Sequence, residues 1–309
     1  MTNGLKDAWP ALPLESWRET RETLHLWMQM VGKTRLALAP MVNHWWHVPL
    51  YVSARGLTTS HIPYRDAGFS AEFDFIDHRL VVEHDDGHAW STALAPRSVA
   101  DFYHDYMAGL ASLGIDVSIW PVPVEIADPI PFADDRQHAS YDAESAHRFW
   151  RALVQADRVL QIFRGRYVGK SSPVHFFWGS FDLACTRFNG DTAPTHPGGA
   201  PGVADWVTRE AYSHSCISAG WWPGVAGGPV EEAVFYAYAY PEPAGCPTAL
   251  IRPAAGSYHE GMKEWILPYE AVRSAADPDE AALEFFQSTY EAAATLGGWK
   301  RAALERPET

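Results

Sequence analysis

The sequence predicts an α+β protein built from two similar units, each with a helix, an antiparallel sheet and a second helix. Strand-like runs come in consecutive groups instead of alternating singly with helices, which favours antiparallel sheets. Apolar residues with helical spacing precede and follow each group. A stretch with four prolines and five acidic residues, 121–142, separates the two groups and is the expected linker.

A chain of 309 residues is long enough for one large domain or two ordinary ones, and we expect two units packed together. The expected boundaries are an N-terminal extension at 1–14, a first unit at 15–120, the linker at 121–142, a second unit at 143–300 and a tail at 301–309.

The first unit is expected to begin with a helix over 15–33. Leu24, Trp27 and Val31 follow the i, i+3, i+7 spacing that places apolar side chains on one helical face. Gly32 is expected to end this helix, because glycine favours helix termini and disfavours helix interiors.

Short runs broken by Gly, Pro and Asp fill 35–93 and predict β-strands. The segment 44–52 is expected to be extended, because Pro40 and Pro49 argue against a helix there. A hairpin turn is expected at 77–78.

A helix over 97–113 closes the first unit, with Ser98 as its N-cap. The second unit repeats this order. Its expected elements are a helix at 143–166, strands at 174–188, 208–219, 232–240 and 263–268, and a last helix at 278–296.

Local similarities support an internal repeat. The motif VGK occurs at 31–33 and at 168–170, and each copy is followed by a histidine with two aromatic residues, beginning at His44 and at His175. The closing helices share four identities over 13 positions. The alternative is chance recurrence in an aromatic-rich chain, since the Lys-to-His spacing is 11 residues in one half and 5 in the other.

Charge and composition exclude several classes of partner. Lys and Arg total 24 against 38 Asp and Glu, and the net charge of −14 would repel nucleic acid. We expect no membrane partner, because the start lacks a signal-peptide pattern and no apolar run could cross a bilayer. The three cysteines have no CxxC spacing, which favours reduced thiols and a cytoplasmic location.

The stretch NHWWHVPLY contains two histidines, His44 and His47. In an extended segment they point to opposite faces, so we do not expect them to chelate one ion together. His44 has an apparent counterpart in His175, and both would line a cleft if the two sheets face each other. The alternative for each is a buried histidine with a hydrogen-bond partner.

The stretch EAYSHSCISAG, read as a strand, places Glu210, Tyr212 and His214 on one face. Imidazole and carboxylate suit zinc or iron, and they equally suit a general base with its orienting partner. The alternative is a solvent-facing strand. The candidate catalytic residues, which are also the candidate metal ligands, are His44, His175, Glu210 and His214.

Aromatic residues favour a ligand site. Tyr236, Tyr238 and Tyr240 alternate with small or apolar residues, and tyrosines with wet hydroxyls line many pockets. The alternative is the rim of a core. We expect ligand or cofactor contacts from Tyr212, Trp178 and Tyr238.

Other polar residues are less specific. Asp182 and Arg187 interrupt an apolar run, where buried charges need partners, and an ion pair between them is one interpretation. No nucleophile elbow, P-loop, dinucleotide fingerprint or HExxH motif is present.

Four segments together resemble the signature segments of an uncharacterised bacterial family of single-chain proteins, classed as a domain of unknown function. They are LALAPMVNHWWHVPLYVSARGLTTS, SPVHFFWGSFDLACTRF, EAYSHSCISAGWWPG and AYAYPEP. The resemblance covers 15–305 and implies a soluble bacterial protein of this length. It carries no known activity, cofactor or catalytic residue.

We therefore expect an enzyme that acts on a small, partly apolar molecule in an aromatic cleft between the two units. Its His/Glu site would work with zinc or iron, or by metal-free acid–base chemistry. The alternative is a non-catalytic small-ligand-binding or sensor protein that uses the same pocket. Fold-level analogy does not decide between them.

Overall fold

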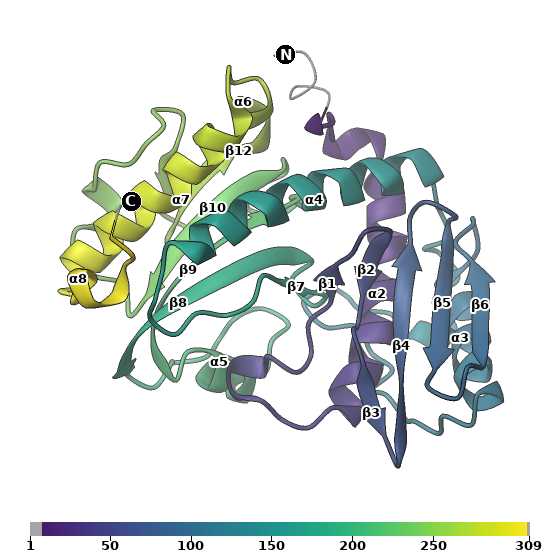
Figure 1. Ribbon diagram of the computed structural model, residues 1–309. Helices are drawn as coiled ribbons and strands as arrows, with labels where there is room; N and C mark the ends of the chain where they lie inside the picture. The colour runs from purple at the N-terminus through teal and green to yellow at the C-terminus, as the bar shows by residue number, and fades with distance from the viewer. Residues whose placement is uncertain (1–7, 308–309) are drawn as a thin grey trace.

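The computed structural model describes residues 8–307, which form seven α-helices and two antiparallel sheets of six strands each (Figure 1). The predicted α+β class is confirmed. The N-terminal half contains η1 (Leu14–Ser16), α2 (Arg18–Leu38), η2 (Asn43–Trp45), β1 (Tyr51–Val52), β2 (Gly56–Thr58), β3 (Ile62–Tyr64), β4 (Ala67–Asp74), β5 (Arg79–His84), β6 (Ala89–Ala93), α3 (Val99–Ser112) and η3 (Phe132–Asp134).

The C-terminal half repeats the order of helix, sheet and helix, with extra short elements. It contains α4 (Ala143–Gly165), β7 (His175–Phe177), β8 (Asp182–Thr192), α5 (Asp205–Ala211), β9 (His214–Trp222), β10 (Val234–Tyr240), η4 (Cys246–Thr248), β11 (Ser257–His259), β12 (Glu264–Pro268), α6 (Tyr269–Arg273), α7 (Pro278–Leu296) and α8 (Arg301–Leu304). Descent of the two halves from one duplicated unit stays a prediction.

The long helices agree with the sequence pattern, except where α2 ends. Ser98 caps α3 by accepting the Asp101 N–H at 3.1 Å, as predicted. Gly32, in contrast, lies inside α2 and does not end it. A Cβ at Gly32 would lie 2.2 Å from the Trp178 ring, so glycine is required for a tertiary contact, which overrides its low helix propensity.

The segment 44–52 is not a regular strand, which corrects the prediction. His44 and Trp45 adopt left-handed backbone angles, with φ of 59° and 62°, inside η2. Non-glycine residues rarely adopt this conformation without support. Here Glu210 accepts the His44 N–H at 2.9 Å, and the Trp45 indole donates to the Val207 carbonyl at 2.9 Å.

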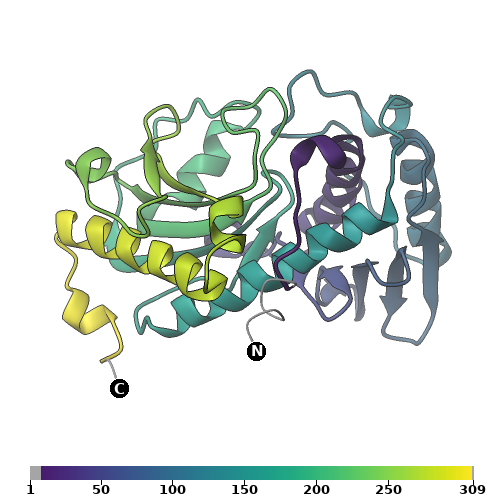
Figure 2. The ribbon, with the colours of Figure 1, turned by 90° about the horizontal axis from the view of Figure 1, so that it is seen from above.

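The two sheets meet edge to edge. In the first the order is β1-β2-β4-β5-β6, with β3 paired to β4, and in the second it is β11-β12-β10-β9-β8-β7. Leu50, just before β1, exchanges two backbone hydrogen bonds with Phe176 of β7, at 2.8 and 2.9 Å. Helix α4 contacts α2 and β1 of the first half and β8 and β9 of the second, and Figure 2 shows it crossing from one to the other.

The second sheet has two unlike faces. On one, Phe176, Trp221 and Phe235 pack against α4 and α7, which lie above the sheet in Figure 1. The opposite face, which we call the loop-covered face, is partly polar. It carries His175, Asp182, Ala184, Thr186, Phe188, Cys216, Ser218, Gly220, Tyr236, Tyr238 and Glu264.

Asp182 and Arg187 lie on opposite faces of β8, so they form no ion pair. Arg187 is fully buried on the helix side, where its guanidinium lies 3.4 Å from the Phe163 ring centroid and 4.2 Å from that of Tyr290. Cation–aromatic contacts take the place of the carboxylate partner that the sequence suggested.

The expected linker and extension are packed into the protein. The Gln29 side-chain amide on α2 binds both backbone groups of Val124, at 2.8 Å each, so 121–142 is irregular but held in place. Trp9 is fully buried against Phe235 and Tyr269. Residues 1–7 and 308–309 of the expected extension and tail lie outside the described residues.

None of the helices in the described part of the chain has the length and apolarity needed to cross a membrane.

Candidate functional site

His44 is held in one tautomer on the loop-covered face. Its ring stacks on Phe188 with centroids 4.5 Å apart. Nδ1 lies 3.1 Å from the Ala211 carbonyl oxygen, which can only accept, so Nδ1 carries the proton. Nε2 keeps its lone pair and accepts a hydrogen bond from the Lys170 amine at 3.1 Å. Burial and then the charge of Lys170 lower the pKa of His44, which favours neutral imidazole.

Lys170 lies on the segment that borders β8, and its ammonium has aromatic neighbours. Nζ lies 5.1 Å from the Trp46 ring centroid and 5.0 Å from that of Phe188, although the residue is exposed. Burial lowers the pKa of Lys170, and the charge of Glu210 partly opposes this shift. No carboxylate among residues 8–307 forms an ion pair with it.

Glu210 and His214 complete this group. Glu210 comes from α5 and holds the His44 backbone, while His214 opens β9 with its ring 5.5 Å from that of His44. The His214 Nδ1 lies 3.1 Å from the Ser213 hydroxyl. We call His44, Lys170, Glu210 and His214 the His44 cluster. Three of the four predicted site residues therefore come together, and their catalytic role stays a prediction.

The strand predicted through EAYSHSCISAG begins later than expected. Glu210 belongs to α5 and Tyr212 follows its end, so neither is on a strand. His214, Cys216 and Ser218 do share one face of β9, as predicted. Glu210, on α5, and Tyr212, just after it, still reach the same face, where Glu210 accepts the His44 N–H and the Tyr212 hydroxyl lies 3.0 Å from that of Tyr238.

His175 lies apart from the His44 cluster. Its ring is 1% exposed and is surrounded by the rings of Trp46, Tyr51 and Phe177. Neither ring nitrogen has a hydrogen-bond partner among the described residues, and burial lowers the pKa of His175 to about 3. Trp46 touches both His175 and His44, with centroid distances of 6.0 and 5.5 Å.

The four predicted metal ligands do not form one compact group in this structure. Both nitrogens of His44 are engaged, one by Ala211 and the other by Lys170, and His175 lies in an aromatic box. Within residues 8–307, no three or more His, Cys, Asp or Glu side chains are grouped so that they could hold a metal ion. A zinc or iron site formed by His44, His175, Glu210 and His214 therefore stays a prediction.

A second group of titratable side chains lies on the same face around Asp182. The Tyr236 hydroxyl donates to Oδ2 of Asp182, and the Ser180 hydroxyl donates to Oδ1. The Tyr236 ring passes over Gly220, where an added Cβ would lie 2.5 Å from the ring. Burial raises the pKa of Asp182, while the two hydroxyl donors oppose the shift.

Glu264 extends this group from β12. Ala237 pairs with Trp265, which places Glu264 beside Tyr238 on the loop-covered face. Burial, and then the charge of Asp182, raise the pKa of Glu264 to about 8. A carboxyl group with this pKa is mostly protonated at neutral pH and can donate a proton.

Glu125 approaches from the expected linker. Its carboxylate lies over Gly179, where an added Cβ would be 2.3 Å from Oε1, and its backbone N–H donates to the Gly202 carbonyl at 3.2 Å. Burial, followed by the charge of Asp182, raises the pKa of Glu125 to about 7. Its proton therefore exchanges near neutral pH.

The two groups are contiguous. We call Glu125, Asp182, Tyr212, Tyr236, Tyr238 and Glu264 the acid–tyrosine cluster. The Tyr212 and Tyr238 hydroxyls are 3.0 Å apart, and Ala211, next to Tyr212, accepts the hydrogen bond from His44. Two of the three predicted ligand contacts, Tyr212 and Tyr238, thus lie on this face. Trp178 instead packs in the core against α2, where its indole donates to Val48.

Comparison with known proteins places the chain in a family. A model described as a family of unknown function, DUF5996, matches residues 9–306. The chain belongs to this family. The match confirms the resemblance to an uncharacterised family across nearly the whole chain. No curated protein and no solved structure matches it.

Sequence reasoning missed three members of these groups in this DUF5996 protein. Glu125 lies in a stretch interpreted as a linker, and Lys170 was noted only as part of VGK. Glu264 lies in the expected strand at 263–268, where the sequence pattern does not single it out. The alternation of Glu264 and Ile266 against Trp265 could have placed that carboxyl on the same face as Tyr238.

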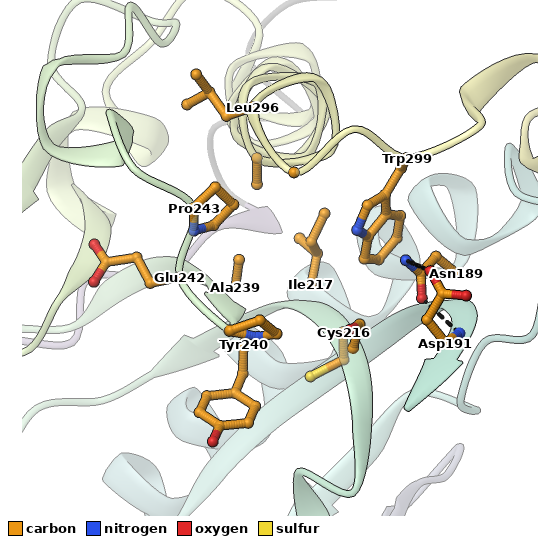
Figure 3. Close-up of a pocket in the computed structure, with 14 residues that line it drawn as sticks. Asn189, Asp191, Cys216, Ile217, Ala239, Tyr240, Glu242, Pro243, Leu296 and Trp299 are labelled. Atoms are coloured by element: carbon orange, nitrogen blue, oxygen red, sulfur yellow. Dashed lines mark hydrogen bonds between the residues drawn. The ribbon is translucent and has the colours of Figure 1, made fainter. Parts of the chain in front are cut away.

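A separate pocket of about 240 Å³ lies where β8, β9 and β10 meet the end of α7 (Figure 3). Ile217, Ala239 and Leu296 give it an apolar lining, and Trp299 forms one side. The Tyr240 ring points away from these residues, and its hydroxyl donates to Pro194. The carboxyls with raised pKa all lie outside this pocket, so it is not the candidate site.

Proposed function

We propose that this protein is an enzyme that acts on a small, partly apolar molecule at the loop-covered face by metal-free acid–base chemistry. The observation that carries this proposal is the convergence of three carboxyl groups from separate segments, Glu125, Asp182 and Glu264, without a cation partner among the described residues. Asp182 accepts two hydroxyl hydrogen bonds, whereas no side-chain hydrogen bond or ion pair with a described residue reaches the carboxyl of Glu125 or Glu264. Buried carboxylates used only for stability normally have such partners. Perturbed acids of this kind are typical of functional sites.

The pKa values of Glu264 and Glu125 suggest the chemical role of each carboxyl group. Glu264 would supply a proton to the bound molecule, since its pKa of about 8 keeps it protonated at neutral pH. Glu125, with a pKa of about 7, would take or return a proton. The Tyr212 and Tyr238 hydroxyls would position the polar part of the molecule, and the rings of Trp46 and other aromatic residues its apolar part.

The proposal includes a location and a source for the protein, namely the cytoplasm of a bacterium. All three cysteines are free thiols and buried, which supports a cytoplasmic location. The bacterial source rests on the resemblance of the four sequence segments quoted above.

The test is a ligand screen by saturation-transfer NMR with mixtures of small metabolites. Glu264→Gln removes the proton donor, and Glu260→Gln, an exposed carboxyl four residues away, is the matched control. We expect at least one compound to bind the wild-type and control proteins and to be converted by both, but not by Glu264→Gln.

Other outcomes separate the alternatives. A compound whose binding depends on Glu264 but which is never converted supports the non-catalytic binding or sensor protein instead. A screen in which no compound distinguishes Glu264→Gln from the control overturns the assignment of this face.

A further inference from the structure

Lys170 and His44 have the arrangement of an activated nucleophile. In such arrangements a nucleophile lies within hydrogen-bond distance of a base, and a third group orients that base. The Lys170 Nζ lies 3.1 Å from the His44 Nε2, and the Ala211 carbonyl fixes the opposite nitrogen as N–H at 3.1 Å. Glu210 holds the backbone of His44 in its left-handed conformation.

The other lysines among residues 8–307 lack this arrangement. The sequence contains five, of which Lys6 lies outside the described residues. Lys33 is 3% exposed, and its ammonium donates to two backbone carbonyls. Lys263 and Lys300 are exposed and have no side-chain hydrogen bond among the described residues. Lys170 alone among the described lysines combines solvent access with a fixed basic partner.

We propose that Lys170 is a nucleophilic amine that forms an imine with a carbonyl compound, an aldehyde or a 2-oxo acid, with His44 as its base. This deepens the proposed function, on which it rests, by naming the substrate class. The Trp46 and Phe188 rings beside Nζ would contact the apolar part of that substrate. Burial also lowers the pKa of Lys170, which favours the free amine.

The step balances without a further reactant. His44 Nε2 takes one proton from the ammonium, and the freed nitrogen pair attacks the carbonyl carbon to form the C–N bond. The carbonyl oxygen receives a proton from this nitrogen and then the proton held by His44, and it leaves as water. Of the three hydrogens on the ammonium, two leave in the water and one stays on the protonated imine.

The test uses the full-length protein with glyoxylate and sodium cyanoborohydride, which reduces an imine to a stable secondary amine. Mass spectrometry of peptides then gives a labelling rate for each lysine. We expect Lys170 to be labelled at least about a hundredfold faster than Lys263 and Lys300, the low end of what a positioned base contributes. Equal rates for the three lysines would overturn the proposal.

The variant His44→Asn distinguishes loss of the basic partner of Lys170 from loss of the folded structure. Asparagine tolerates the left-handed backbone and can still donate to Ala211, but it has no acceptor in the place of Nε2. We expect Lys170 labelling in this variant to fall to the rate of Lys263, with an unchanged circular dichroism spectrum. Labelling that stays fast in His44→Asn would show that the lysine does not need this partner, and the pair would be rejected.

The labelling rate of Lys170 is independent of the result of the ligand screen. Glu264→Gln should leave the labelling of Lys170 intact, because trapping with glyoxylate requires no proton from Glu264. If a ligand depends on Glu264 but Lys170 is not labelled preferentially, only the proposed role of Lys170 is rejected. If Lys170 is labelled preferentially but no ligand depends on Glu264, only the assigned role of Glu264 is rejected.

Discussion

Replacing Glu264 by glutamine should change how the stability of this protein depends on pH. In the unfolded chain this carboxyl titrates near its ordinary value of 4.5, whereas in the folded protein its pKa is about 8. The folded state therefore binds one more proton than the unfolded state between these values. The stabilising contribution is fully present below pH 4.5 and is lost as the pH rises toward 8.

The size of the effect follows from the shift. A displacement from 4.5 to about 8 corresponds to a loss of about 5 kcal/mol of unfolding free energy across that pH range. This is an upper limit, because Glu264 is half-buried and water screens part of the penalty. A glutamine side chain at this position would not titrate, so we expect Glu264→Gln to be more stable than wild type at alkaline pH.

Urea unfolding of wild type, Glu264→Gln and Glu260→Gln at several pH values measures this directly. The difference between wild type and Glu264→Gln should widen by at most about 1.4 kcal/mol for each pH unit between 4.5 and about 8, and level off above. Glu260→Gln should follow the wild-type curve. Parallel curves for all three proteins would refute the reasoning that burial beside Asp182 keeps Glu264 protonated.

Three further substitutions test the packing that supports the site, each by urea unfolding. Arg187→Ala should lose about 3 kcal/mol of stability by removing contacts with the rings of Phe163, Tyr167 and Tyr290, and Arg187→Met should recover most of it. Equal losses for the two variants would contradict this account of how Arg187 is packed. Gly32→Ala should cost about 2 kcal/mol or more, and Trp178→Phe should relieve part of that cost, whereas additive losses would contradict direct contact. Tyr236→Phe should cost about 1–3 kcal/mol and more as the pH rises and Asp182 ionises, so a loss independent of pH would contradict the hydrogen bond.

Regular elements could be predicted from the sequence because their patterns are local. The helix over 278–296 has the predicted bounds, and the hairpin turn at 77–78 is where expected. Gly32 and the segment 44–52 were not predictable in this way. In both cases a side chain distant in sequence, Trp178 or Glu210, determines the local conformation.

Part of the site was also predictable, because some of its residues follow local sequence patterns. Alternation along a strand identified Tyr238 and His214 as members of a polar face, since that pattern depends only on neighbouring residues. Glu125 and Lys170 approach the face from irregular segments, and no periodicity marks them. Their roles depend on the charge of Asp182 and the lone pair of His44, which only the folded chain brings near.

The most direct test of the central claim is a ¹³C NMR titration of the glutamate side-chain carboxyls, with Glu264→Gln and Glu125→Gln used for assignment. We predict midpoints near 8 for Glu264 and near 7 for Glu125, so that both can exchange protons with a bound molecule at neutral pH. If both titrate near the ordinary glutamate value of 4.5, neither glutamate can donate a proton at neutral pH and the proposed acid–base site is contradicted.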